Sequence, residues 1–325
     1  MTDLYSLVKD TSAYLTVKGE KASGRLSHAY LILTADKVNL KEYLKIFASL
    51  IACESVEPCG NCRACNLIKD GAHADVIFYP QGDSINSEEV NALIEESYLK
   101  PIELDKKIFV LCDAQDMNAQ AQNKLLKTLE EPPQNVHILM GATSEFPLLS
   151  TIKSRVKKLE IPSFSKEKLF DALISDYPDS ERLKTAIACS DGTVGSVTAL
   201  YADERLKDIT SLCTKIITDM QSSKDVLKYS AAVAASKCEV GEFLSVLELL
   251  FREMLVAKSG LDLLSNPNDY ALIKDAKGFL EGSIIHALES IQEAQKRKKF
   301  NANPTMLIEW LLFQILEGKY KWQKL

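Results

Sequence analysis

The chain has 325 residues, more than one typical domain, and 46% of them are hydrophobic, which is enough for more than one buried core. Its formal net charge of −6 argues against a free-standing binder of duplex nucleic acid, because such a binder needs a basic face to displace counterions from phosphates. No run of about 18 apolar residues is present, so the sequence predicts no membrane-spanning helix.

Five short, largely apolar runs alternate with helical patterns in the first half of the chain. Runs of this kind fit strands that are covered on both faces. The helical pattern at 87–99 has Ser87 as its expected N-cap and Pro101 just beyond its end. Strands separated by helices predict a parallel sheet with helices on both faces. The predicted strands are 29–33, 76–79, 107–112, 136–140 and 156–161, and the predicted helices are 40–52, 87–99 and 118–129.

The loop after the first predicted strand, residues 34–40, contains no glycine. A phosphate-binding loop at this place uses glycines so that backbone N–H groups wrap the anion, and a lysine that meets the outer phosphates. Here Lys37 stands alone and is interpreted as a solvated loop residue, while Asp36 would repel an anion. After the third strand, Asp113 follows Cys112 instead of a second acid, and one carboxylate alone cannot both hold Mg²⁺ and polarise a water. The sequence predicts a nucleotide-type sheet that binds no ATP.

Between the first two predicted strands, four cysteines fall within thirteen residues, at Cys53, Cys59, Cys62 and Cys65. Structural Zn²⁺ is held by four thiolates at about 2.3 Å, and two-residue spacings let a tight turn, here helped by Gly60, present neighbouring sulfurs. Four thiolate ligands leave no open position for a water, and no His-Glu-x-x-His or His-x-Glu pattern occurs elsewhere. The sequence therefore predicts a structural zinc site in residues 53–65.

Two readings compete with a site of four cysteines. Two disulfides would need an oxidising compartment, whereas the chain starts with the polar residues Met1-Thr-Asp and has no apolar signal sequence, so we expect a reduced cytoplasmic protein. His73 lies eight residues after Cys65 and is an alternative fourth ligand, although an exposed turn histidine is the expected interpretation. The remaining cysteines stand singly in apolar segments, at Cys112, Cys189, Cys213 and Cys238.

After Pro162 the strand pattern ends and only helical patterns follow. Residues 243–256 (FLSVLELLFREMLV) are apolar on almost every face, so this helix is expected to be buried among others. The fold class is therefore α/β plus all-α. The predicted organisation is an α/β domain at 1–161, a small helical lid at 162–204 and a helical domain at 205–325.

Four segments, in this order along the chain, resemble the clamp-loader branch of the AAA+ superfamily. They are residues 24–30 (GRLSHAY), the cysteine cluster, residues 123–133 (NKLLKTLEEPP) and residues 151–155 (TIKSR). The run LLKTLEEPP is highly specific for that branch. The resemblance implies an AAA+-type parallel sheet core with an inserted zinc module, a small helical lid, and a C-terminal collar domain that joins five subunits into a ring.

The pair Ser154-Arg155 carries the most consequential implication of the resemblance. In the family, a Ser-Arg-Cys motif at the edge of the first domain points its arginine into the ATP site of the adjacent subunit, so Arg155 is implied to act in trans as an arginine finger. Val156 replaces the cysteine of that motif, an apolar exchange at a strand position with little expected loss. The alternative is a surface arginine in a basic stretch that contains Lys153, Lys157 and Lys158.

The resemblance implies a subunit of a replicative clamp loader that does not itself hydrolyse ATP. It would assemble with ATPase subunits of the gamma or tau type and with a delta subunit in a pentameric ring, within a DNA polymerase holoenzyme, and help load the sliding clamp onto primer-template DNA.

Two alternatives stay open. An ATP-hydrolysing gamma-type subunit is one, and the loop at 34–40 argues against it. A zinc-bearing nucleic-acid-binding protein is the other, but only Arg63 and Lys69 supply positive charge near the cysteines. The basic run from Lys296 to Lys299 is expected to be a solvated helix end.

Overall fold

The computed structural model describes residues 4–82, 84–236, 238–258, 279–299 and 303–323. Its contacts divide the chain into two compact units. The first contains the residues up to 176 together with 192–195, and the second contains residues 177–191 and those from 196 onward. The division into three domains, with boundaries at 161 and 204, stays a prediction.

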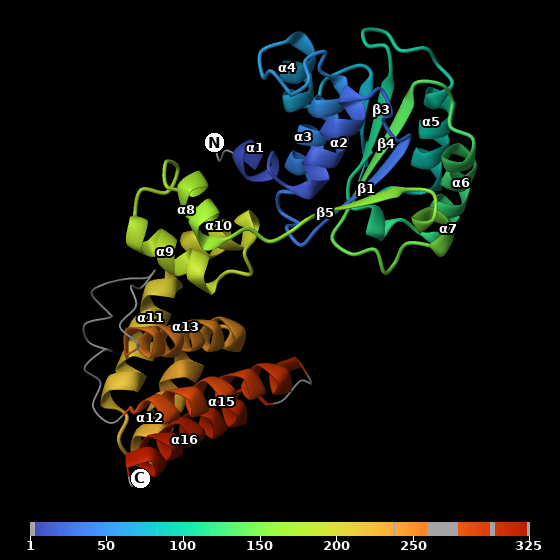
Figure 1. The fold of residues 1–325 in the computed structure, drawn as a ribbon. Helices are drawn as coiled ribbons and strands as arrows, with labels where there is room; N and C mark the ends of the chain where they lie inside the picture. Colours follow the sequence, from blue (N-terminus) through green and yellow to red (C-terminus); the bar gives the residue numbers. More distant parts are fainter. Residues whose placement is uncertain (1–3, 83, 237, 259–278, 300–302, 324–325) are drawn as a thin grey trace. The chain divides into compact units, whose positions relative to one another are not determined.

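The core of the first unit is a five-stranded sheet in which every neighbouring pair of strands is parallel. The strands lie in the order β2-β3-β4-β1-β5 (Figure 1), which confirms the predicted parallel sheet. Small differences occur at the strand ends, because β3 stops at Leu111 and β5 starts only at Lys157. The strands are β1 (Ala29–Thr34), β2 (Val76–Tyr79), β3 (Lys107–Leu111), β4 (Val136–Ala142) and β5 (Lys157–Ile161).

Helices cover both faces of this sheet, as the alternation of strands and helices predicts (Figure 1). Tyr30 and Ile32 of β1 belong to the core on one face, and Leu31 between them belongs to the core on the other. Successive side chains of a strand point to opposite faces, so a fully buried strand is apolar at every position. The covering helices are α2 (Ser12–Ala22) and α3 (Leu40–Ala52) on the first face, and α5 (Ser87–Ser97) and α6 (Ala119–Glu130) on the second.

The expected N-cap of α5 is wrong by one residue. The side chain of Asn86, not of Ser87, caps the helix, because its oxygen accepts the backbone N–H groups of Glu88 and Glu89 at 2.9 and 3.0 Å. Asn and Ser are similarly good caps, so the sequence alone does not choose between adjacent ones. The first unit also contains the short helices α1 (Leu4–Val8), α4 (Arg63–Asp70), η1 (Ala114–Asp116), α7 (Ser150–Lys153) and α8 (Lys166–Leu173).

Within the described residues, the second unit contains helices and no strand. Its central helix is α13 (Val240–Lys258), which packs against α9, α11 and α15. Phe243, Leu247 and Phe251 of α13 are fully buried, which confirms the burial predicted for residues 243–256. None of the described helices is long and apolar enough to cross a bilayer. The other helices are α9 (Ser180–Cys189), α10 (Val194–Ala202), α11 (Arg205–Asp219), α12 (Ser223–Ala235), α15 (Glu281–Lys299) and α16 (Pro304–Gln323).

Candidate functional site

The four clustered cysteines come together next to the first face of the sheet. Cys53 directly follows α3, Cys59 lies in the connecting loop, Cys62 is the N-cap of α4, and Cys65 lies in the first turn of that helix. All four Sγ atoms lie within 4.8 Å of one another, and those of Cys53 and Cys62 are 3.9 Å apart. The chain therefore gathers four thiol ligands at one point.

Backbone N–H groups donate to two of these sulfurs, and burial acts on another. The N–H of Cys62 donates to Cys59 Sγ at 3.3 Å, and the N–H of Cys65 donates to Cys62 Sγ at 3.4 Å. Donors of this kind, from Asn61 and Cys62, lower the pKa of the Cys59 thiol to about 6. Burial raises the pKa of the Cys65 thiol to about 12. Gly60 has a positive φ of 71°, so the turn between the cysteines uses a conformation that favours glycine.

The geometry of the cluster fits a tetrahedral thiolate site. Zn–S bonds of about 2.3 Å place tetrahedral sulfurs about 3.8 Å apart, close to the distance between Cys53 and Cys62. No disulfide joins these residues. His73 is not part of the cluster. It is buried rather than exposed as expected, and its Nδ1 accepts the backbone N–H of Asp75 at 3.0 Å.

Sequence patterns gave no indication that Lys21 belongs to this site. Its ammonium group, on α2, donates to the carbonyl oxygen of Leu50 at 2.7 Å and to those of Cys53 and Ser55. The carbonyls of Leu50 and Cys53 lie at the C-terminal end of α3, where the helix has unpaired acceptors and a partial negative charge. Lys21 thus holds the segment that carries the first cysteine and places a positive charge beside the cluster.

A buried carboxylate is connected, through the segment 102–104, to the helix that carries Cys65. Asp75, fully buried just before β2, accepts the backbone N–H groups of Ile102, Glu103 and Leu104 at 2.6 to 2.8 Å. The side chain of Glu103 then pairs with Arg63 of α4 through two contacts of 2.9 and 3.0 Å. Arg63 is therefore part of a structural brace.

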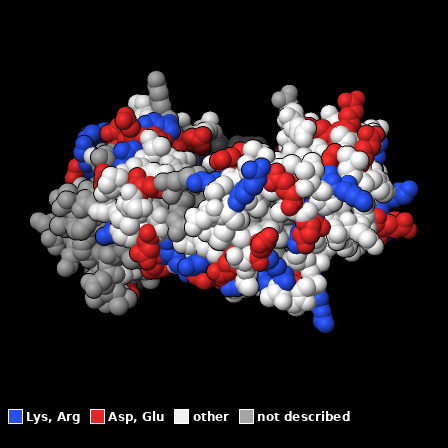
Figure 2. Space-filling view, turned by 90° about the horizontal axis from the view of Figure 1, so that it is seen from above, with Lys and Arg blue, Asp and Glu red and all other residues white. Residues whose placement is uncertain are grey.

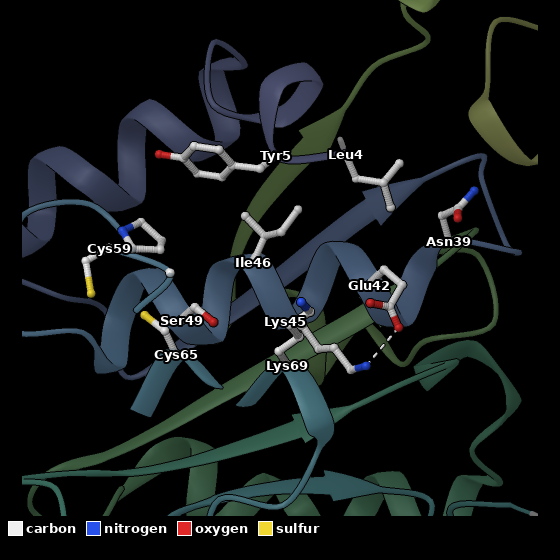
Figure 3. Close-up of a pocket in the computed structure, with 12 residues that line it drawn as sticks. Leu4, Tyr5, Asn39, Glu42, Lys45, Ile46, Ser49, Cys59, Cys65 and Lys69 are labelled. Atoms are coloured by element: carbon white, nitrogen blue, oxygen red, sulfur yellow. Dashed lines mark hydrogen bonds and ion pairs between the residues drawn. The ribbon is translucent and has the colours of Figure 1, made fainter. Parts of the chain in front are cut away.

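A groove of about 710 Å³ runs along α3 and ends at the cysteines. Figure 3 shows Leu4 and Tyr5 of α1 on one side of it and the pair formed by Glu42 and Lys45 on α3. Cys59 is exposed and lines the end of the groove together with Cys65. Solvent and small chelators can therefore reach the Cys59 thiol from this side.

The loop after β1 contains the exposed Lys37 and the buried Asp36. Lys37 is exposed, and its only described ion pair is a 4.0 Å contact with Asp116, as expected for a solvated loop lysine. Asp36 next to it is buried, with 2% of its surface exposed. Its carboxylate accepts hydrogen bonds from Asn39, Tyr43 and Gly195.

The ends of β3 and β4 are joined by a chain of hydrogen bonds. Gln115 Nε2 donates to Asp113 Oδ1 at 2.9 Å, and Gln115 Oε1 accepts the backbone N–H of Thr143 at 3.1 Å. In a doubly wound sheet, ligands bind beyond the carboxyl ends of the strands. Here the polar groups at that edge bond to one another.

Arg155 follows the short helix α7 and lies against the end of α6. Its Nη2 is 2.5 Å from Glu130 Oε1, and its Nη1 donates to the carbonyl of Thr151 at 2.9 Å and to Ser154 Oγ at 3.2 Å. The side chain is 34% exposed, so it is neither buried nor free. Val156, which replaces the cysteine of the family motif, is buried.

The basic run at 296–299 is partly engaged within its own unit. Arg297 pairs with Glu293 at 3.0 Å, and its guanidinium lies 4.1 Å from the centre of the Trp310 ring. The side chain of Lys299 lies outside the described residues. On the face that Figure 2 shows, acidic and basic side chains are interspersed.

Comparison with known proteins agrees with this architecture. Residues 10–165 match the family model described as DNA polymerase III, delta subunit. Together with the five-stranded parallel sheet, the cysteine cluster and the helical C-terminal region, this match over just under half of the chain makes the protein similar to clamp-loader subunits of the AAA+ superfamily.

The chain is similar to delta-prime subunits over nearly its whole length. It is 27% identical over 304 residues to the DNA polymerase III subunit delta' of Bacillus subtilis, an alignment that covers 90% of this chain and 92% of that protein. It is 26% identical over 287 residues to the tau subunit of the same organism, which covers 82% of this chain but only 49% of that protein. Among solved structures, a gamma subunit-related protein of Thermotoga maritima aligns with a TM-score of 0.40 and 18% identity, over 93% of this chain and 99% of that one.

Proposed function

We propose that this chain is a clamp-loader subunit that hydrolyses no ATP itself and acts in the cytoplasm. It assembles with gamma- or tau-type ATPase subunits and a delta subunit in a pentameric ring, and the assembly loads the sliding clamp onto primer-template DNA. The alignment with a delta' subunit over nearly the full length of both proteins carries this proposal. The C-terminal helical unit would form the collar of the ring.

Arg155 is the residue through which the chain would act on ATP. It lies in the Ser-Arg pair after α7, on the surface of the first unit, with Ser154 Oγ in hydrogen-bond contact. An arginine that neutralises charge on a transferring phosphoryl group can change the rate by about 10³ to 10⁵. In this proposal Arg155 leaves Glu130 and bonds to the phosphate in the neighbouring subunit, while Ser154 helps to position it.

The absence of ATP chemistry in the chain itself is proposed from three features. The loop at 34–40 has no glycine, its Asp36 occupies the place of an anion, and Asp113 bonds to Gln115. The alternative of an ATP-hydrolysing gamma-type subunit requires a phosphate-binding loop at residues 34–40. The alternative of a zinc-bearing nucleic-acid-binding protein is weakened because Arg63, one of the two positive charges near the cysteines, pairs with Glu103.

Structural zinc is the proposed cofactor. Cys53, Cys59, Cys62 and Cys65 would hold it, and its chemistry would be to tie the loop between α3 and α4 to both helices. The interatomic distances and the N–H donors to sulfur support this assignment.

Reconstitution tests the proposal. The chain should co-purify with a gamma- or tau-type ATPase subunit and a delta subunit, and ATP hydrolysis stimulated by DNA and clamp should require its presence. The isolated chain should show no heat of binding in a titration with Mg·ATP. Micromolar ATP binding that disappears in Lys37→Ala would overturn the proposal in favour of the gamma-type reading.

A further inference from the structure

Asp36 is a buried carboxylate in the loop that follows β1, and hydrogen bonds alone satisfy its charge. It is 2% exposed, and in the part of the chain that the structure describes no lysine, arginine or histidine forms an ion pair with it. A buried charge is costly unless hydrogen-bond donors surround it. The donors here are the backbone N–H of Asn39 at 3.1 Å, the amide of Asn39 at 2.9 and 3.2 Å, and the hydroxyl of Tyr43 at 2.9 Å.

These donors occupy the place where α/β proteins usually bind an anion. In such folds, phosphates sit at the loop after a strand and at the N-terminus of the next helix, where backbone N–H groups point at the ligand. Asn39 is the N-cap residue of α3, and its N–H donates to Asp36. Burial and the neighbouring negative charge of Asp36 raise the pKa of Tyr43 above its usual range.

A further donor comes from a distant part of the chain. The backbone N–H of Gly195 donates to Asp36 Oδ2 at 3.0 Å, from the turn at residues 192–195, whose last two residues are the first two of α10. The carbonyl of Gly192 in that turn accepts the N–H of Phe164 at 2.9 Å. A Cβ at Gly195 would collide with the carboxylate and lie 2.8 Å from Val38 Cβ, so the contact requires glycine.

We propose that the carboxylate of Asp36 is an internal ligand that holds the turn at 192–195 against the loop after β1. It fills the position of a nucleotide phosphate and supplies the negative charge that this position is built to bind. The turn, which contains the start of α10, is therefore held in place without a nucleotide. The inference concerns the isolated chain and goes beyond the proposed role in the clamp loader.

Hydrogen exchange of the full-length chain, followed by mass spectrometry, tests this inference. Asp36→Ala removes the acceptor, and Gly195→Ala pushes the turn away while Asp36 stays intact. Loss of one hydrogen bond to a charged group should raise exchange in peptides covering 192–195 by about tenfold or more. Exchange in β3 should stay unchanged. Asp36→Asn, which keeps a carbonyl acceptor but no charge, should fall between wild type and Asp36→Ala.

Two variants serve as matched controls. Lys37→Ala changes the exposed neighbour of Asp36, and Gly19→Ala adds a methyl group at a helical glycine with nothing within 4 Å. Both should leave exchange at 192–195 unchanged. The inference is overturned if Gly195→Ala and Asp36→Ala leave that exchange at the wild-type level, or if Gly195→Ala speeds exchange equally in β3, which would indicate general destabilisation. If Asp36→Ala does not fold, hydrogen exchange at 192–195 in Gly195→Ala alone tests the inference.

Discussion

The guanidinium of Arg155 lies 2.5 Å from the carboxylate of Glu130, the last residue of α6. The motif that contains LLKTLEEPP and the motif that contains Ser-Arg are therefore in direct contact. Arg155 donates at the same time to the carbonyl of Thr151, so both of its terminal nitrogens are bonded within the same chain. A role at the ATP site of another subunit requires these bonds to be exchanged for bonds to phosphate.

Arg155→Ala should reduce ATP hydrolysis by the reconstituted clamp loader without disturbing folding or assembly, because an exposed ion pair contributes little to stability. The loss should be confined to the one ATP site that this subunit completes, which gives a partial fall in total turnover and a larger defect in clamp loading. Steady-state ATPase and loading assays measure both. Lys153→Ala, which removes a neighbouring positive charge, is the control. Unchanged hydrolysis and loading in Arg155→Ala would show that the subunit is a scaffold only.

Glu130→Gln should raise ATP hydrolysis by the assembly, because it removes the competitor for Arg155. The increase should not exceed about fivefold, since exposed ion pairs are worth about 0–1 kcal/mol. The matched control is Glu131→Gln, next to Glu130 in the sequence. A clear decrease in hydrolysis, with normal assembly, would indicate that Glu130 positions the arginine instead of holding it back.

Freshly reduced protein should contain about one zinc per chain, and Cys62→Ser should lose most of it, because structural zinc needs all four thiolates. Removal of the metal by a chelator should unfold residues 53–70 first, since binding and folding are coupled there. Metal analysis and limited proteolysis measure these effects. Cys238→Ser, outside the cluster, should keep its zinc. Full zinc content in Cys62→Ser would argue against this ligand set.

Lys21→Met should weaken zinc retention by about 10- to 100-fold, because groups that orient metal ligands from outside typically contribute that much. Lys21 holds the carbonyls of Leu50 and Cys53 and adds positive charge beside the thiolates. Competition with a chromogenic chelator gives the affinity. The control is Lys9→Met, which replaces an exposed lysine between α1 and α2 and should leave the zinc affinity at the wild-type value. Equal zinc affinity in the two variants would show that Lys21 contributes only to packing.

Asp75→Asn should lower the free energy of unfolding at neutral pH by about 1–3 kcal/mol, because three backbone donors lose a charged acceptor. Burial acts to raise the pKa of Asp75, but the N–H groups of Leu104, Ile102 and Glu103 outweigh it and hold the pKa below its ordinary value. A depressed pKa means that this stability is present above about pH 4, the unfolded value, and is lost as the pH falls through the folded value. Urea unfolding between pH 3 and 7 measures the free energy of unfolding of both proteins. The difference between wild type and Asp75→Asn should shrink only at the acid end of this range. A constant difference over that range would contradict the assignment.

Much of the fold could be read from periodicity. Apolar runs bounded by helical patterns identified all five strands and the three helices at 40–52, 87–99 and 118–129, with errors of only one or two residues at most ends. These features depend on local spacing, which a sequence displays directly. The strand order did not follow from spacing, because it depends on which crossovers pack best in three dimensions.

The cysteine cluster and the Ser-Arg pair were also visible in the sequence, since their residues lie within a few positions of one another. Their surroundings were not. Lys21 reaches Cys53 from a different helix, Glu130 meets Arg155 across 25 residues, and Gly195 meets Asp36 across 159. The sequence identified Asp36 only as a charge that would repel an anion, and the structure shows that this carboxylate is buried. Local spacing thus determined which chemical groups the chain contains, whereas packing between distant segments decided how those groups are paired, because a hydrogen bond depends on separation in space and not along the chain.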